Sequence, residues 1–197
     1  MLELLDIEQN YFQGELPVDV LKNLNFAINK PKSVGIIGPS GSGKTSLLNI
    51  IGLIEKPKFG SYFFKNSNCL DFSNTEKTEF RKKNIGYIFQ NNQLLEDFNV
   101  QENVALPLIL NGESYKNSCK KALNFLKLFG LENRMSFKPG LLSGGEQQRV
   151  AVARAMIKSP SILLADEPTG SLDDNNAELI FNYIIELSKK NNTLAII

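Results

Sequence analysis

The segment GPSGSGKT, residues 38–45, has residue types and spacing that can hold phosphate groups. Gly38, Gly43, Lys44 and Thr45 fit the pattern G-x-x-x-x-G-K-[ST]. In this pattern the glycines let backbone N–H groups turn toward phosphates, the lysine reaches the β- and γ-phosphates, and the hydroxyl holds Mg²⁺. We therefore predict a nucleoside triphosphate site in this phosphate loop and the residue after it, made of Gly38, Pro39, Ser40, Gly41, Ser42, Gly43, Lys44, Thr45 and Ser46.

A pair of acids, Asp166 and Glu167, follows the apolar run ILLA. The run predicts a buried strand, and the C-terminal ends of parallel strands open onto the ligand crevice. We expect Asp166 to bind Mg²⁺ and Glu167 to act as the general base that polarises an attacking water. The alternative is that Glu167 is only an acid on a surface loop.

A second glycine-rich segment, LLSGGEQQRVAVARA at residues 141–155, precedes a helix that we expect from Glu146 onward. A γ-phosphate spreads charge in its transition state and needs positive groups on more than one side. Backbone amides and a helix N-terminus can supply the second side. We expect Ser143, Gly144, Gly145 and Glu146, within the LSGGE segment (residues 142–146), to face the nucleotide of a second copy in a head-to-tail dimer.

Strand-like and helix-like segments alternate along the chain, which predicts an α/β fold with a mostly parallel sheet covered on both faces. Residues 91–158 are expected to form an inserted, mostly helical subdomain within one domain, residues 1–197. Apolar patterns predict buried strands at residues 33–38, 83–90, 161–166 and from 193, short strands at 61–72, and helices at 43–55, 114–130 and 175–190. Asn99 with Glu102 predicts a capping box, and Gly130 a helix C-cap.

The composition limits the class of protein. Hydrophobic residues make up 42% of the 197 and charged residues 22%, which is typical of a globular domain. A net charge of +1 argues against a nucleic-acid partner. The two cysteines stand in no metal-type spacing and are expected to be free thiols. The longest clean apolar run, residues 104–110, is too short to span a bilayer, so we expect a cytosolic chain that reaches a membrane only through partners.

These motifs and their order resemble the nucleotide-binding domain of ATP-binding cassette (ABC) proteins, over essentially the whole chain. The resemblance implies a P-loop fold with a small antiparallel β subdomain, ATP and Mg²⁺ as ligands, and ATP hydrolysis. It implies that Lys44 and Gln90 join Glu167 in catalysis, with Gln90 contacting the metal beside Thr45 and Asp166. Asp173, in SLD, falls in the loop that crosses the dimer interface. Tyr11 falls where an aromatic stacks on adenine, although Phe12 is adjacent and a lone aromatic there can also be core packing.

Two classes of cassette compete. Soluble cassettes that act on DNA or ribosomes usually carry two cassettes or a long coiled coil, and neither feature is seen between Gln90 and Leu142. We therefore expect a transporter motor bound to integral membrane subunits at the cytoplasmic face of the inner membrane. The segment NIGYIFQNNQLLEDFNVQENVALPLIL is similar to the subgroup that serves lipoprotein release, macrolide export and cell division, with lipoprotein release the nearest. Asn92, Gln93 and Glu96 depart from the subgroup pattern and leave the cargo open; a generic amphipathic helix pair is the alternative.

The chain contains no histidine. The resemblance implies a histidine just after the strand that begins at TLAII, where it contacts the γ-phosphate. We expect a cassette truncated at its C-terminal end, in which ATP binding survives better than hydrolysis.

Overall fold

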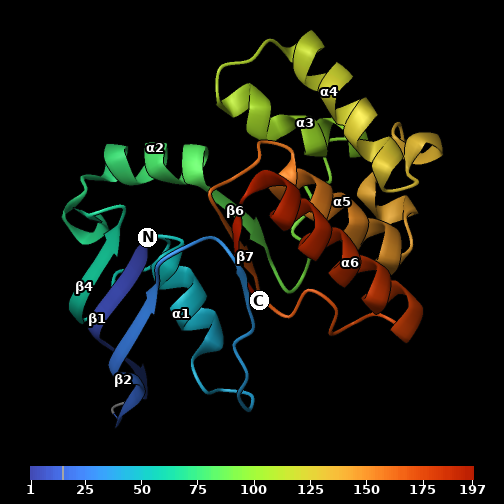
Figure 1. Ribbon diagram of the computed structural model, residues 1–197. Helices are drawn as coiled ribbons and strands as arrows, with labels where there is room; N and C mark the ends of the chain where they lie inside the picture. The colour runs from blue at the N-terminus through green and yellow to red at the C-terminus, as the bar shows by residue number, and fades with distance from the viewer. Residues whose placement is uncertain (15) are drawn as a thin grey trace.

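The computed structural model describes residues 1–14 and 16–197, which form two sheets and the helices around them (Figure 1). The strands are β1 (Leu2–Gln13), β2 (Leu16–Ile28), β3 (Ser33–Val34), β4 (Phe59–Phe64), β5 (Ser67–Asn68), β6 (Ile85–Ile88), β7 (Ile162–Ala165) and β8 (Leu194–Ile196). The helices are α1 (Lys44–Ile51), α2 (Asn74–Asn84), α3 (Val100–Leu110), α4 (Tyr115–Leu128), α5 (Gly144–Met156) and α6 (Asp174–Asn191).

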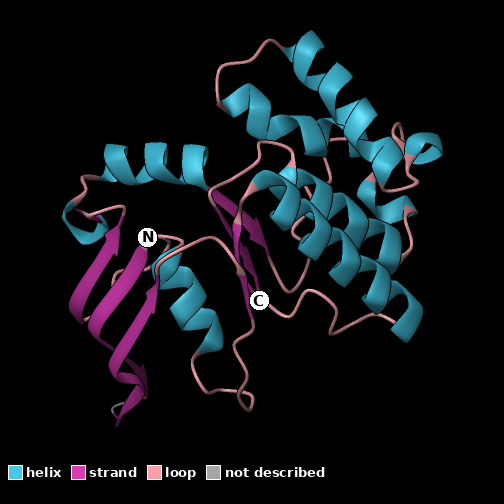
Figure 2. Cartoon of the chain, in the orientation of Figure 1, coloured by secondary structure: helices cyan, strands magenta, loops and turns pink. Residues whose placement is uncertain are grey.

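One sheet is antiparallel and the other is parallel, and they are separate in Figure 2. The antiparallel sheet has the order β2-β1-β4-β5, and the parallel sheet has the order β3-β8-β7-β6. In the parallel sheet, β8 and β7 are the inner strands, and Ile162 of β7 lies opposite Ile85 of β6 on one side and Leu194 of β8 on the other. The expected α/β fold, with a parallel core sheet and a smaller antiparallel sheet, is confirmed.

The parallel sheet lies between two apolar cores. Ile162 and Leu164 of β7 face the core shared with α1 and the antiparallel sheet, while Leu163 and Ala165 face the core shared with α3, α4, α5 and α6. Since side chains alternate along a strand, a β7 that is apolar at all four positions must be covered on both faces. This burial holds the C-terminal end of β7 in a fixed place.

Helices dominate the stretch between β6 and β7. Asn99 and Glu102 form the expected capping box at the start of α3. Gly130 follows the C-cap of α4 with φ +64°, as expected for a glycine that ends a helix. Figure 1 shows α3 and α4 together above α5 and α6. Whether residues 91–158 act as an inserted subdomain stays a prediction.

Two predicted elements are shorter than expected. The strand at residues 33–38 pairs with β8 only as far as Ile36, whose N–H donates to the carbonyl of Ile197 at 2.7 Å. The helix expected over 43–55 ends at Ile51, because Leu53 adopts a left-handed conformation with φ +53°. Arg81 stabilises this turn by donating to the carbonyl oxygen of Leu53 at 2.8 Å.

Other elements were not predicted from the pattern of the sequence. Helix α2 has no fully buried residue, so it carries no apolar periodicity, although Ser73 and Glu76 form a capping box at its start. Strands β1 and β2 are long and irregular, with register shifts that break simple alternation. Only local caps and tertiary pairing determine these elements.

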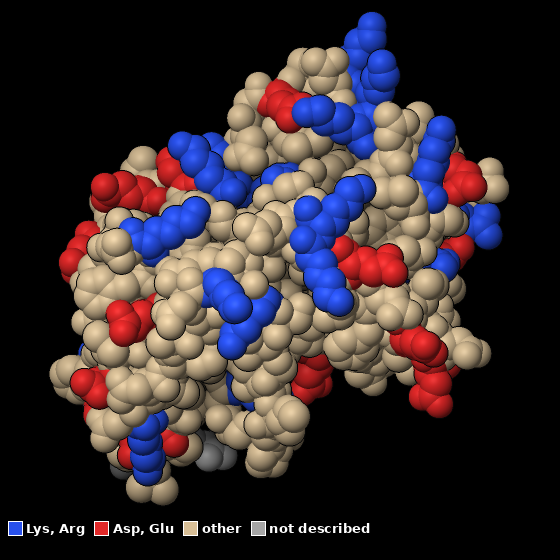
Figure 3. All heavy atoms as spheres, in the orientation of Figure 1, with Lys and Arg blue, Asp and Glu red and all other residues tan. Residues whose placement is uncertain are grey.

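Among the described residues, no helix is both long and apolar enough to cross a membrane. Basic and acidic side chains are interspersed over the face shown in Figure 3, in line with a net charge of +1.

Candidate functional site

The phosphate loop leads directly into α1. Gly43 is the N-cap residue with φ +90°, and a Cβ there would lie 2.7 Å from Cγ1 of Val20. Only glycine fits this backbone without strain. The start of α1 has no side-chain cap and no acidic residue in its first turn. Its first N–H groups are therefore free to bind an anion, and the helix dipole favours one there.

The side chain of Lys44 folds back over the first residues of the phosphate loop. Its Nζ donates to the carbonyl oxygens of Gly38 at 2.9 Å and Pro39 at 3.0 Å, and it lies 4.0 Å from Oε1 of Glu167. The ammonium group is thus held at the mouth of the loop, between the loop carbonyls and a carboxylate. Incoming phosphate oxygens can replace these partners because they carry more charge than a carbonyl.

The ends of β6 and β7 bring the remaining polar groups to the loop. Ile88 pairs with Ala165, and the N–H of Asp166 donates to the carbonyl of Ile88 at 2.9 Å. Two residues further along, the side-chain amide of Gln90 donates to Oε2 of Glu167 at 3.1 Å. The parallel register therefore joins residues that are 77 positions apart.

The two acids differ in environment. Asp166 is only 7% exposed, whereas the side chain of Glu167 is 46% exposed. Glu167 also has φ +46°, a backbone conformation that a non-glycine residue adopts at a cost of about 1 kcal/mol or more and that clusters at functional sites. The buried acid can hold a metal while the exposed acid can exchange a proton with water.

A cavity of about 350 Å³ lies over the loop, which we name the phosphate cavity. Its wall carries most of the predicted nucleotide and catalytic residues together with Val20, a residue that the sequence did not single out. The lining consists of Tyr11, Val20, Ser40, Gly41, Gly43, Lys44, Thr45, Ser46, Gln90 and Glu167. A larger cavity of about 530 Å³ shares Lys44 and Glu167 and has Asp166 in its wall, but it is mostly apolar beyond these residues, so the triphosphate fits the polar cavity better.

Tyr11 stands at the rim of the phosphate cavity. Its hydroxyl bonds with Oγ of Ser46 at 2.9 Å and donates to Oε1 of Glu55 at 2.6 Å. Partial burial and the hydrogen bond to Glu55 raise the pKa of Tyr11. The ring is 39% exposed, so one face remains available for a base. Glu55 was missed by the sequence, where nothing distinguishes it from a surface acid.

The LSGGE segment does not reach this cavity. None of Ser143 to Glu146 is among the described residues that line it. The helix begins at Gly144, two residues earlier than expected, because Ser143 caps it in a capping box with Glu146. Hydrogen bonding from the backbone of Ser143 and from Arg134 lowers the pKa of Glu146. The amides of Gly144 and Gly145 are left without intrahelical acceptors.

Asp173 lies near the LSGGE segment. It caps α6, and the side chain and backbone of Asn176 donate to its carboxylate and lower its pKa. A Cβ at Gly145 would lie 2.9 Å from Oδ1 of the same Asn176. The structure thus gathers two predicted interface elements around Asn176, which the sequence did not indicate.

The oxygen ligands for a divalent cation come from separate elements. Among the described residues, no group of three or more histidine, cysteine, aspartate or glutamate side chains could hold a metal by itself. Mg²⁺ is usually bound by one or two carboxylates, waters and substrate phosphates rather than by an all-protein cage. Thr45 and Gln90 in the wall of the phosphate cavity fit that pattern, together with the buried carboxylate of Asp166, which lines the adjoining larger cavity.

Comparison with known proteins defines the class. The model of the ABC transporter family matches residues 21–170, and the chain belongs to this family. It is therefore a transporter ATPase, a protein that binds and hydrolyses ATP. The chain is similar over its full length to the dimeric ADP- and Pi-bound structure of the ATP-binding cassette MJ0796, with a TM-score of 0.92, 39% identity and 86% of that chain covered.

Individual relatives carry a more specific name. The lipoprotein-releasing system ATP-binding protein LolD of Buchnera aphidicola is 43% identical over 197 residues, 100% of this chain and 86% of the relative. The LolD protein of Pseudoalteromonas translucida is 45% identical over 188 residues, 95% of this chain and 81% of the relative.

Proposed function

We propose that the chain is the ATP-hydrolysing subunit of a transport complex that releases lipoproteins from the inner membrane. The similarity to LolD proteins of several bacteria supports the cargo. Its place is then the cytoplasmic face of that membrane, bound to integral membrane subunits. The observation that carries the chemistry is the convergence of Lys44, Gln90 and Glu167 at the phosphate loop.

The residues divide the work between binding and proton transfer. The loop amides and Lys44 hold the β- and γ-phosphates, and Tyr11 stacks on the adenine. Thr45, Gln90 and Asp166 would hold Mg²⁺, which would supply positive charge against the charge that develops on the phosphates. Glu167 accepts a proton from the water that attacks the γ-phosphorus, while the bond from that phosphorus to the β-phosphate oxygen breaks to give ADP and phosphate.

A second copy completes the site. The LSGGE segment lies outside the phosphate cavity of its own chain, and its free glycine amides are available to an anion from elsewhere. Dimeric cassette structures 39% and 40% identical to this chain support a dimer. We infer a head-to-tail dimer in which Ser143, Gly144 and Asp173 approach the partner's nucleotide.

Direct titration tests the nucleotide site. Lys44→Ala is expected to weaken ATP binding by about ten- to hundredfold, because charge-assisted hydrogen bonds to the phosphates are lost. Lys22→Ala is the matched control, since the Lys22 side chain on β2 is 71% exposed and its one ion pair among the described residues is with Asp19. Equal ATP affinities for both variants would overturn the assignment.

Reconstitution tests the cargo. The chain, combined with the membrane subunits of a LolD relative in proteoliposomes that carry a lipoprotein, should release that lipoprotein on ATP addition. An active ATPase that releases none would separate the motor function from the proposed cargo.

A further inference from the structure

Arg154 is a half-buried cation held by backbone carbonyls. It lies in the last turn of α5, where its Nη1 donates to the carbonyl of Gln93 and its Nη2 to the carbonyl of Asn92, each at 2.7 Å. Burial lowers the pKa of Arg154 to about 10. Within residues 1–14 and 16–197 it makes no ion pair with a carboxylate. Partial removal of a guanidinium from water carries a cost, which these two hydrogen bonds offset.

The two carbonyls belong to the turn directly after Gln90, which we name the Gln90 turn (residues 90–93). Asn92 and Gln93 both have left-handed backbones, with φ +42° and +46°. Such consecutive conformations are unfavourable for non-glycine residues and persist only when surrounding groups hold them. The planar guanidinium of Arg154 holds the two neighbouring carbonyls through two separate nitrogens, whereas a lysine would have to reach both through one.

Helix α5 also holds the strand that leads into this turn. A Cβ at Gly86 of β6 would lie 2.5 Å from the carbonyl oxygen of Ala155, so strand and helix are in close contact. The same helix begins at Gly144 of the LSGGE segment, with Ser143 as its N-cap. One rigid element therefore connects the LSGGE segment to the Gln90 turn.

We propose that Arg154 is a positioning residue that fixes the Gln90 turn to α5 and so sets the place of Gln90 beside Glu167. The proposal rests on the role proposed above for Gln90 in ATP hydrolysis. Arg154 itself is not among the described residues that line the phosphate cavity, so it acts through Gln90 rather than on the nucleotide.

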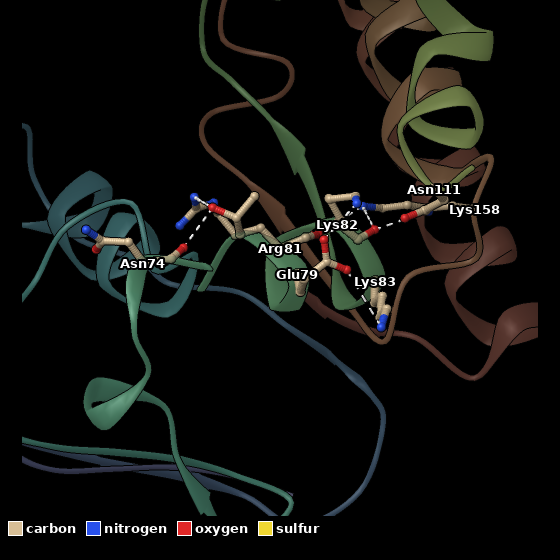
Figure 4. Close-up of polar contacts among 8 residues, drawn as sticks. Asn74, Glu79, Arg81, Lys82, Lys83, Asn111 and Lys158 are labelled. Atoms are coloured by element: carbon tan, nitrogen blue, oxygen red, sulfur yellow. Dashed lines mark hydrogen bonds and ion pairs between the residues drawn. The ribbon is translucent and has the colours of Figure 1, made fainter. Parts of the chain in front are cut away.

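Lys158, two residues after the end of α5, provides a matched control. It is also a half-buried cation, and its acceptors among the described residues are the backbone carbonyls of Arg81 at 3.0 Å and Lys82 at 2.6 Å (Figure 4). Asn111 donates to the same Lys82 carbonyl at 3.3 Å. These contacts hold the C-terminal end of α2, which leads into β6, whereas the Gln90 turn follows the opposite end of that strand. Lys158→Met therefore removes a similar half-buried cation without releasing that turn.

Hydrogen–deuterium exchange of the whole chain without nucleotide tests the geometry. In Arg154→Met, the peptide that covers residues 89–99 should exchange about tenfold faster, because the amides of Asn92 and Leu95 lose a fixed turn. Arg154→Lys should show a smaller increase, and Lys158→Met should leave this peptide unchanged. Unchanged exchange in Arg154→Met, or an equal increase in Lys158→Met, would overturn the proposal.

A double-mutant cycle with Gln90→Ala tests the link to catalysis. Arg154→Met should lower kcat by about ten- to hundredfold with little change in ATP affinity, as expected when a reacting group is misplaced by about 1 Å. In the Gln90→Ala background the same change should lower kcat by less than about twofold. Equal losses in both backgrounds would show a merely structural role. If the unmodified chain hydrolyses no ATP, the proposed function fails, whereas the exchange experiment still tests the position of the turn.

Discussion

Replacing Glu167 by glutamine separates proton transfer from nucleotide binding. The amide has nearly the shape of the carboxylate, and its oxygen can still accept the hydrogen bond that Gln90 now donates at 3.1 Å. What is lost is the negative charge, and with it the ability to accept a proton. Removing a positioned general base typically lowers the rate by about 10²- to 10⁴-fold, and we expect kcat of Glu167→Gln to fall in this range.

The same substitution should strengthen ATP binding slightly. Lys44 lies 4.0 Å from the carboxylate, and loss of that partner frees the ammonium group for the phosphates. Because the Glu167 side chain is 46% exposed, solvent screening limits this contribution to about 1 kcal/mol or less, which corresponds to at most about fivefold in Kd. Loss of carboxylate–phosphate repulsion acts in the same direction.

Steady-state phosphate release and calorimetric titration with ATP measure the two effects on one preparation. Glu186→Gln is the control, since this acid is exposed on α6. A Glu167→Gln variant whose kcat stays within about threefold of the unmodified chain would refute the assignment of the general base, because that loss is far below the range for such a group. ATP affinity that falls as strongly as kcat would instead place Glu167 in nucleotide binding.

Three further outcomes follow from the site and its supports. Ser143→Arg and Lys44→Ala should each be inactive alone, but an equal mixture should recover part of the ATPase activity. The reason is that one of the two composite sites in a mixed dimer keeps both Lys44 and Ser143. Activity of purified Ser143→Arg would contradict the shared site. Gly43→Ala should lower Tm by about 4 °C or more and weaken ATP binding, since its φ is +90° and the new Cβ would meet Val20; calorimetric melting measures this. Burial lowers the pKa of Lys158 from its ordinary value of 10.5 to about 8. Between these two pH values the unfolded chain binds more protons than the folded chain, so the free energy of unfolding should rise with pH in that window. Denaturant titrations at several pH values should show a smaller rise for Lys158→Met.

Local pattern was sufficient wherever a function or an element depends on neighbours in the chain. The phosphate loop could be predicted because a glycine-lysine-threonine spacing places amides, an ammonium and a hydroxyl around one centre regardless of the rest of the fold. The Asn99–Glu102 capping box and the Gly130 C-cap were predictable for the same reason. Strand β7 was predictable because four consecutive apolar residues leave no face for solvent.

Tertiary structure alone decided how distant segments meet. Gln90 and Glu167 are in contact because β6 and β7 pair in parallel register, and nothing in either segment specifies that register. The end of α1 at Ile51 depends on a turn at Leu53 that Arg81 stabilises from α2, a helix without an apolar face of its own. Arg154 is one of many basic residues in the sequence. Its importance comes from hydrogen bonds to two backbone carbonyls some sixty positions away, and backbone carbonyls leave no mark on the sequence because every residue has one.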